Sequence, residues 1–343
     1  AFWGVAALSV LYWHVHLSHL ALRANLYVLL GTLAAAWMVR AHRTNSRRAW
    51  IAGGTILGAL GYTYFASVGW MAYVGVLTLG VAICDRQRRH NAALSLLIAL
   101  AVVLPMGIYV VRYPEASLSR PSGVAVTDGG WLRNAQRWGA AWFQQGDLNH
   151  VVNLPGRPIL GPVTGALAAL GLVGGAVFSR RWRYAALLIG WGGMACLPSL
   201  VSQPAPHFLR ASGMTVAIGL IIGAGARLLG GLCRRLVKTR GSEVLGSLLL
   251  IPVAVVTYRD FHLEWVNHPD TFMAMEQHVG QAADYLRDHA PCDHHIYFSP
   301  LSSAHPVVLF HRAVLAPRPV AGFSSDQCLV LPESPADYAS VTL

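Results

Sequence analysis

A short segment between two apolar stretches, residues 203–210, carries side chains suited to binding an anion. Its sequence is Gln-Pro-Ala-Pro-His-Phe-Leu-Arg, and the two prolines keep the backbone out of a helix until about His207. His207 and Arg210 stand three residues apart, so on the first turn of a following helix they share one face. The free N–H groups, the helix dipole and the guanidinium would all favour a phosphate there. The alternative is that Arg210 anchors the chain to lipid headgroups.

A second candidate is Asp147, in the sequence Gly-Asp-Leu-Asn-His of residues 146–150. A carboxylate at this place could act as a general base or a metal ligand. An Asp that follows Gly is also typical of a turn or a cap, which is the alternative role. Turn-forming residues continue to Pro158, and they predict a structured loop that leads back into the next apolar stretch.

Three histidines and an arginine close the first apolar stretch, on the same predicted face of a membrane as the two candidates above. The spacings of two and three between His14, His16 and His19 do not form a zinc site. We therefore expect these side chains to lie near a substrate, and we expect Arg23 to contribute a cation for a phosphate. The residues predicted to lie near a substrate are His16, His19, His150 and Arg157.

The elements that must position these residues are membrane helices. The chain has 343 residues, of which 55% are apolar and 12% are charged, a composition that excludes a water-soluble enzyme. A bilayer core needs about 20 mostly apolar residues per helix. About nine such stretches occur, so the predicted fold is an α-helical polytopic membrane protein. Their approximate ranges are 1–16, 25–39, 50–65, 69–84, 91–111, 159–178, 184–201, 213–232 and 244–258.

Small residues spaced four apart within these stretches would allow close helix packing in lipid, although glycine is also common in membrane helices. The pairs are Gly54/Gly58, Gly161/Gly165, Gly171/Gly175 and Gly219/Gly223.

The net charge of +11 is distributed unevenly between the loops. Alternate loops hold 15 basic and two acidic residues, a formal charge of +13, whereas the remaining 11 basic and 13 acidic residues sum to −2. The positive-inside rule places the basic loops in the cytoplasm and the candidate residues on the exoplasmic face of the inner membrane. The charge is therefore a topology signal and does not indicate nucleic-acid binding.

The exoplasmic loop 112–158 is too long to be a simple connector. Trp131, Trp138 and Trp142 share one face of a predicted helix over 131–146, with arginines on other faces. This pattern predicts an amphipathic helix in the headgroup layer of the membrane. The alternative is a helix packed on the outer surface of the protein itself.

The chain from 259 to 343 is the one water-soluble part, and it follows a membrane domain over 1–258. A helix over 272–290, strands over 295–299 and 327–331 and a helical turn over 306–312 predict a small exoplasmic α/β unit. Cys292 and Cys328 are disulfide candidates, because a disulfide is permitted on that side of the membrane. The acid- and histidine-rich run 288–295 lacks metal-ligand spacing and is predicted to be an exposed loop.

Motifs for ATP, dinucleotides and hydrolytic catalysis are missing from the sequence, and acidic residues are nearly absent from the apolar stretches. ATP coupling and ion-coupled transport therefore have no support.

Four stretches together resemble the polytopic GT-C glycosyltransferases of the protein mannosyltransferase and aminoarabinose transferase type. They are 13–23 (Trp-His-Val-His-Leu-Ser-His through Leu22-Arg23), 58–64 (GALGYTY), 146–158 (Gly-Asp-Leu-Asn to Asn-Leu-Pro-Gly-Arg-Pro) and 206–210 (Pro-His-Phe-Leu-Arg). His19 stands where members of this family commonly have Arg, a role that Arg23 could fill.

The resemblance implies an inverting transfer of sugar from a polyprenyl-phosphate donor to an acceptor at the exoplasmic face, usually with a divalent metal, Mg or Mn. It also implies that the main catalytic acid precedes residue 1, so that this chain is a fragment. Two other functions stay open: a catalytically silent subunit of a larger membrane complex, and a transporter of lipid-linked sugar. The lipid bilayer is the expected partner in each case, and the acceptor is not identified.

Overall fold

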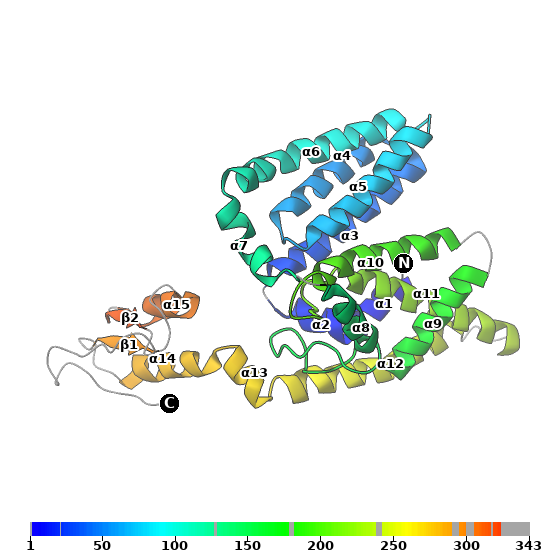
Figure 1. The fold of residues 1–343 in the computed structure, drawn as a ribbon. Coiled ribbons are helices and arrows are strands. Elements are labelled where there is room, and N and C mark those ends of the chain that lie inside the picture. The colour runs from blue at the N-terminus through cyan, green and yellow to red at the C-terminus, as the bar shows by residue number, and fades with distance from the viewer. Residues whose placement is uncertain are drawn as a thin grey trace. The chain divides into compact units, whose positions relative to one another are not determined.

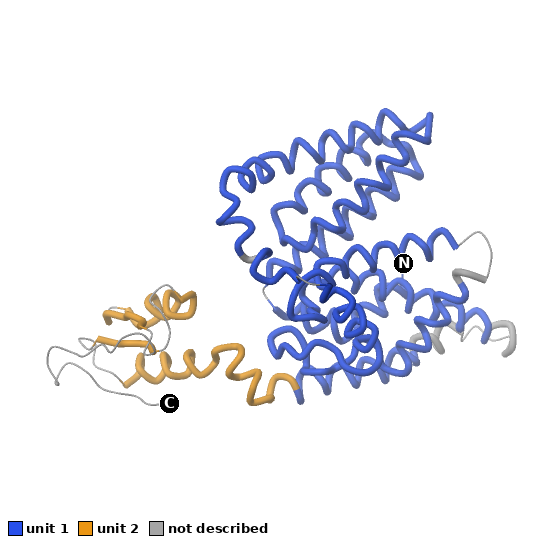
Figure 2. The backbone as a smooth tube through the Cα atoms, viewed as in Figure 1, with its two compact units in different colours: residues 1–264 blue, residues 265–343 orange. Residues whose placement is uncertain are grey.

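The computed structural model describes residues 2–20, 22–126, 129–177, 182–237, 242–289, 295–299, 305–316 and 318–323. The chain divides into two compact units, Ala1–Glu264 and Trp265–Leu343 (Figure 2). The division lies six residues after the boundary predicted at 258/259, because a short π-helix, Arg259–Trp265, continues the last helix of the first unit.

The first unit is built from helices, and Figure 1 shows their arrangement. Its helices are α1 (Phe2–Val10), α2 (Tyr12–Ser18), α3 (Arg23–Thr44), α4 (Arg47–Ala59), α5 (Ser67–Cys84), α6 (Arg89–Arg112), α7 (Pro114–Val124), α8 (Trp131–Ala141), α9 (Pro162–Val177), α10 (Trp182–Leu200), α11 (Met214–Val237) and α12 (Ser242–Tyr258). Each apolar stretch of the sequence corresponds to one of these helices or to a pair of them.

Four helices in the described part of the chain are long and apolar enough to cross a membrane: α3, α5, α6 and residues 214–233 of α11. This agrees with the predicted helical membrane protein, but it does not establish nine spans. The first predicted span divides at Leu11 into α1, of nine residues, and α2, of seven. The third predicted span corresponds to the 13-residue helix α4 and the three-residue 3-10 helix Leu60–Tyr62 that follows it. Both are shorter than the roughly 20 residues that a straight crossing requires.

Two groups of helices form the first unit (Figure 1). Helices α3 to α6 pack mainly on one another, and α11 packs against α1, α9, α10 and α12. Glycine permits the closest approaches between the helix backbones. A Cβ atom added to Gly225 of α11 would overlap the carbonyl of Leu167 in α9, and one added to Gly54 of α4 would overlap the carbonyl of Ser95 in α6. Small residues therefore bring these helix backbones into contact, as expected for membrane helices.

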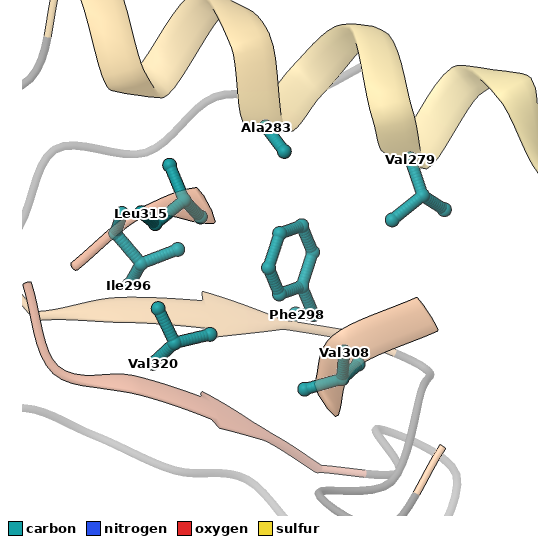
Figure 3. Close-up of a cluster of buried hydrophobic side chains, with 7 residues drawn as sticks. All are labelled: Val279, Ala283, Ile296, Phe298, Val308, Leu315 and Val320. Carbon is teal, nitrogen blue, oxygen red and sulfur yellow. The ribbon is translucent and has the colours of Figure 1, made fainter. Parts of the chain in front are cut away.

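The second unit has a small core of its own. It comprises α13 (Pro269–Ala274), α14 (Gln277–His289), β1 (Ile296–Phe298), α15 (Pro306–Val314) and β2 (Val320–Gly322). The strands are parallel, with Ile296 opposite Val320 and Phe298 opposite Gly322. Figure 3 shows seven buried apolar side chains between the sheet and the helices: Val279, Ala283, Ile296, Phe298, Val308, Leu315 and Val320.

In the described part of the second unit, β1 pairs with β2, a strand that the sequence did not predict. The strand expected over 327–331 lies outside the described residues. A parallel pair needs a crossover connection, and α15 lies within the connection between β1 and β2. The candidate disulfide Cys292–Cys328 also lies outside the described residues.

Candidate functional site

The loop that follows α8 is held by its own backbone hydrogen bonds. The N–H of Gly146 donates to the carbonyl of Gly156 at 3.0 Å, and the N–H of Gly156 donates to the carbonyl of Asp147 at 2.9 Å. A Cβ atom at Gly146 would overlap the carbonyl of Arg157, so this position requires glycine. The loop is therefore a closed, ordered structure, as its turn residues predict.

This loop places Asp147 in the interior, with its side chain 3% exposed. One carboxylate oxygen, Oδ1, accepts a hydrogen bond from the N–H of Asn149 at 2.9 Å. The other, Oδ2, accepts one from the N–H of Phe208 at 2.7 Å. Burial nevertheless raises the pKa of Asp147, since desolvation of the carboxylate outweighs these two bonds. Asp147 thus has the turn role that was considered as the alternative, and its side chain also contacts the 203–210 segment.

His207 lies beside this carboxylate. Its Nδ1 atom is 4.0 Å from Oδ2 of Asp147 and has no hydrogen-bond partner among the described residues. Its backbone N–H donates to Oγ of Ser199 at 2.8 Å, which fixes the backbone at the end of α10. Burial, with Arg210 nearby, lowers the pKa of His207 to about 4, so the imidazole is neutral at physiological pH. A neutral imidazole beside a buried carboxylate can exchange a proton with a bound hydroxyl.

Arg210 completes what we call the polar junction, defined as Asp147, Ser199, Ser202, His207 and Arg210. Its Nη1 atom donates to Oγ of Ser202 at 2.7 Å and to the carbonyl of Gln203 at 2.9 Å. The guanidinium is partly exposed, so it can also meet an anion from outside. The sequence-predicted trio of Asp147, His207 and Arg210 is thus brought together.

The predicted helix N-terminus at His207 is wrong. Helix α11 begins at Met214, and residues 208–213 form a series of turns instead. The first N–H groups of this segment are already used, because His207 donates to Ser199 and Phe208 donates to Asp147. A carboxylate of the chain itself therefore occupies the N–H group that the sequence assigned to a phosphate.

Arg23 and His19 lie apart from the polar junction. Arg23 is the first residue of α3 and is exposed, and none of the hydrogen bonds or ion pairs described for residues 2–237 joins it to the junction. His19 caps the end of α2 and is also exposed. Its ring centroid lies 4.6 Å from that of Phe261. His150 follows Asn149 in the ordered loop and is half-buried.

His16 and Arg157 belong to a second cluster, the arginine bridge, defined as Tyr12, His16, Arg157, Arg259 and Asp260. Nε of Arg157 donates to Oδ2 of Asp260 at 2.5 Å, and its guanidinium lies 3.8 Å from the centre of the Tyr12 ring. Nη2 of Arg259 donates to the other oxygen of Asp260 at 2.7 Å.

His16 is fully buried, with its Nδ1 atom 3.0 Å from the Tyr12 hydroxyl and its Nε2 atom 3.2 Å from the carbonyl of Val151. The bridge joins the loop to α2 and to the end of α12.

The three tryptophans do not share one environment, which corrects the predicted interfacial stripe. Helix α8 ends at Ala141 rather than 146. Trp131 is 56% exposed and Trp142 is half-buried, as an interfacial position allows. Trp138 is only 3% exposed, and its indole N–H donates to Oγ of Ser199 at 3.2 Å. This side chain packs on the protein itself, as the alternative interpretation expected.

Sequence reasoning missed Asp260 and Ser199. Asp260 directly follows Arg259 at the end of an apolar run, and an acid at such a place is a signal for a buried ion pair. Ser199 carries no comparable signal, because its role depends on the approach of Trp138 and His207 from distant parts of the chain.

The polar junction and the arginine bridge are defined only by the distances and hydrogen bonds between their residues. No protein-family model, no curated protein and no solved structure matches this chain.

Proposed function

We propose that the chain is a membrane glycosyltransferase that moves a sugar from a polyprenyl-phosphate-linked donor to an acceptor at the exoplasmic face. The observation that supports this proposal is the polar junction, where a buried acid, a neutral imidazole and a partly exposed guanidinium meet. Such a set can accept a proton and bind a phosphate within one site.

In this reaction the acceptor hydroxyl attacks the anomeric carbon of the sugar. A new C–O bond forms while the bond to the donor phosphate breaks, and the phosphate leaves with that electron pair. The hydroxyl proton would pass through the imidazole of His207 to the carboxylate of Asp147, and Arg210 would bind the leaving phosphate.

A divalent metal does not fit the polar junction. Mg²⁺ prefers several oxygen ligands, and the junction supplies one carboxylate whose two oxygens already accept backbone N–H bonds. The proposed roles therefore use no metal.

The test is a transfer assay with the full chain in lipid nanodiscs. Radiolabelled polyprenyl-phosphate mannose, glucose and aminoarabinose serve as donors, and membrane extracts supply acceptors. His207→Gln and Arg210→Gln should each lower transfer at least a hundredfold, a range typical for loss of one catalytic group. Arg133→Gln, an exposed arginine of α8, is the matched control and should keep normal transfer. Equal transfer by all four proteins would exclude the junction as the active site.

A structural subunit is the second candidate, and one observation favours it. Both oxygens of Asp147 already accept backbone N–H bonds, as they would in a purely architectural turn. This function predicts no transfer with any donor and copurification in a fixed ratio with other membrane proteins. Transfer by the wild-type protein alone would exclude it.

A further inference from the structure

Two short loops, 44–47 between α3 and α4 and 84–89 between α5 and α6, are fastened together away from the polar junction. Nε of Arg88 donates to the carbonyl of His42 at 2.7 Å. Nδ2 of Asn45 donates to the carbonyl of Gln87 at 3.1 Å. Nδ2 of Asn91 donates to Oδ1 of Asn45 at 3.1 Å. These hydrogen bonds hold the ends of α3, α4, α5 and α6 together as one rigid surface.

That surface is strongly basic. Residues 40–48 and 85–90 hold seven arginines and one aspartate, a formal charge of +6. Asp85 is already paired with Arg88 at 2.6 Å, and this hydrogen bond holds the pKa of Asp85 below its usual value. The arginines that remain are all exposed: Arg40, Arg43, Arg47, Arg48, Arg86 and Arg89.

An open hollow of about 580 Å³ lies beside these arginines. It is lined by Leu77, Gly80, Val81 and Cys84 of α5, by Asp85, Arg86 and Gln87 of the loop that follows, and by His42 of α3, so its apolar residues come from α5 and its polar residues from the loop and α3. A Cβ atom added to Gly80 would meet nothing within 4 Å, so this part of the wall is open space. The hollow therefore joins a cationic end to an apolar groove.

The position of the hollow fits the edge of a bilayer. It lies at the ends of α3, α5 and α6, three of the described helices that could span a membrane. The guanidinium of Arg40 lies 5.5 Å from the Trp37 ring centre at the same end of α3. Arginine and tryptophan together are typical of the headgroup level.

We propose that this hollow is a binding site for an anionic phospholipid. The phosphate lies against Arg86 and His42 within the field of the neighbouring arginines, and an acyl chain lies along Leu77, Gly80 and Val81. A free anion would use only the polar end, and a zwitterionic lipid lacks the net charge that this surface attracts. The site is independent of the proposed sugar transfer.

Native mass spectrometry of the detergent-solubilised full chain tests this proposal, with dioleoyl phosphatidylglycerol as the probe and dioleoyl phosphatidylcholine as the comparison. The wild-type chain should retain at least one phosphatidylglycerol under conditions that remove phosphatidylcholine. Arg86→Gln should weaken phosphatidylglycerol binding about fivefold, as expected for one cation near an anionic headgroup. Gly80→Phe should fill the groove and weaken binding by a similar or larger factor.

Two matched variants serve as controls. Gly75→Phe places the same side chain on α5 at a position that is also open but does not line the hollow. Arg183→Gln removes an exposed arginine beside Trp182, at the start of α10. Both should bind phosphatidylglycerol as the wild-type chain does.

Equal weakening by the test and control variants would show general electrostatic attraction and would overturn the proposal. Displacement of the lipid by millimolar inorganic phosphate, with Gly80→Phe unaffected, would show an anion site without an acyl groove and would also overturn it. Retention of phosphatidylcholine as firmly as phosphatidylglycerol would have the same consequence.

Discussion

At Asp147, two backbone N–H groups balance a buried carboxylate without a cation in direct contact. Such bonds are charge-assisted, and they stabilise the ionised form. Burial opposes them and raises the pKa of the group. Because the hydrogen bonds lower the pKa of Asp147 and burial raises it, this carboxylate can gain a proton when a substrate adds a further negative charge nearby. Its structural bonds and its proposed role as a base are therefore compatible.

The low pKa of His207 predicts a loss of stability in mild acid. Its ordinary value of 6.5 falls to about 4 in the folded chain, so folding favours the neutral ring. The stabilisation is complete above pH 6.5 and is lost as the pH falls through 4, by about 3 kcal/mol in total. Thermal unfolding of the purified chain between pH 7.5 and pH 4 should show this loss.

His207→Gln should make that pH profile flatter, because glutamine does not titrate. An unchanged slope in the variant would mean that another group controls the acid response.

Arg157→Ala should destabilise the chain by about 2–4 kcal/mol, because it leaves one oxygen of the buried Asp260 without its cationic donor. Arg157→Lys should cost less, since it keeps the charge but loses the planar contact with Tyr12. Midpoints of thermal unfolding in detergent would measure both losses. A shift no larger than that of the exposed Arg133→Ala would contradict this account of the arginine bridge.

Among the elements, α11 packs on four other helices and meets α9 through glycine. Gly225→Ala should destabilise the chain by about 1–3 kcal/mol or more, since the added methyl group overlaps the carbonyl of Leu167. Gly192→Ala in α10 meets nothing within 4 Å and should be neutral or slightly stabilising. Thermal unfolding of the two variants checks the contrast, and equal melting temperatures would contradict it.

Helices were predictable where apolar residues form long runs, as in α5 and α6. Helix α7 was not predicted, because residues 114–124 contain two prolines and little apolar character. The start of α11 was placed too early for a related reason. The two prolines before His207 mark a turn, but the sequence alone does not show that Phe208 will donate to Asp147 and delay the helix until Met214.

For the whole molecule, the uneven charge of the loops predicts which ends of the helices face the cytoplasm. In a cysteine-free variant of the full chain, Glu115→Cys should react with a membrane-impermeant maleimide in intact spheroplasts. Arg86→Cys should react only after the membrane is permeabilised. Both positions are exposed, so access through the protein does not bias the comparison. The reverse pattern of labelling would invert the predicted topology.

The residues that form the polar junction could be predicted in part from the sequence and the membrane topology that it predicts. Asp147, His207 and Arg210 could be selected by residue type and by their predicted side of the membrane. The separation of Arg23 and the use of Ser199 as a shared acceptor could not be predicted, because both depend on how helices far apart in sequence pack together.

The ordered loop after α8 also affects the chain's exposure to proteases. A protease needs several residues of extended, accessible backbone, and such segments usually lie in loops without regular structure. Residues 146–157 lack helix and strand, yet many of their N–H and carbonyl groups are bonded to one another, and the N–H of Leu154 donates to the Tyr12 hydroxyl. The side-chain carboxylate of Asp147 also accepts a hydrogen bond from the N–H of Phe208. Cleavage should therefore require this loop to open first, so the longest connection of the first unit contains a segment protected from digestion while the chain stays folded.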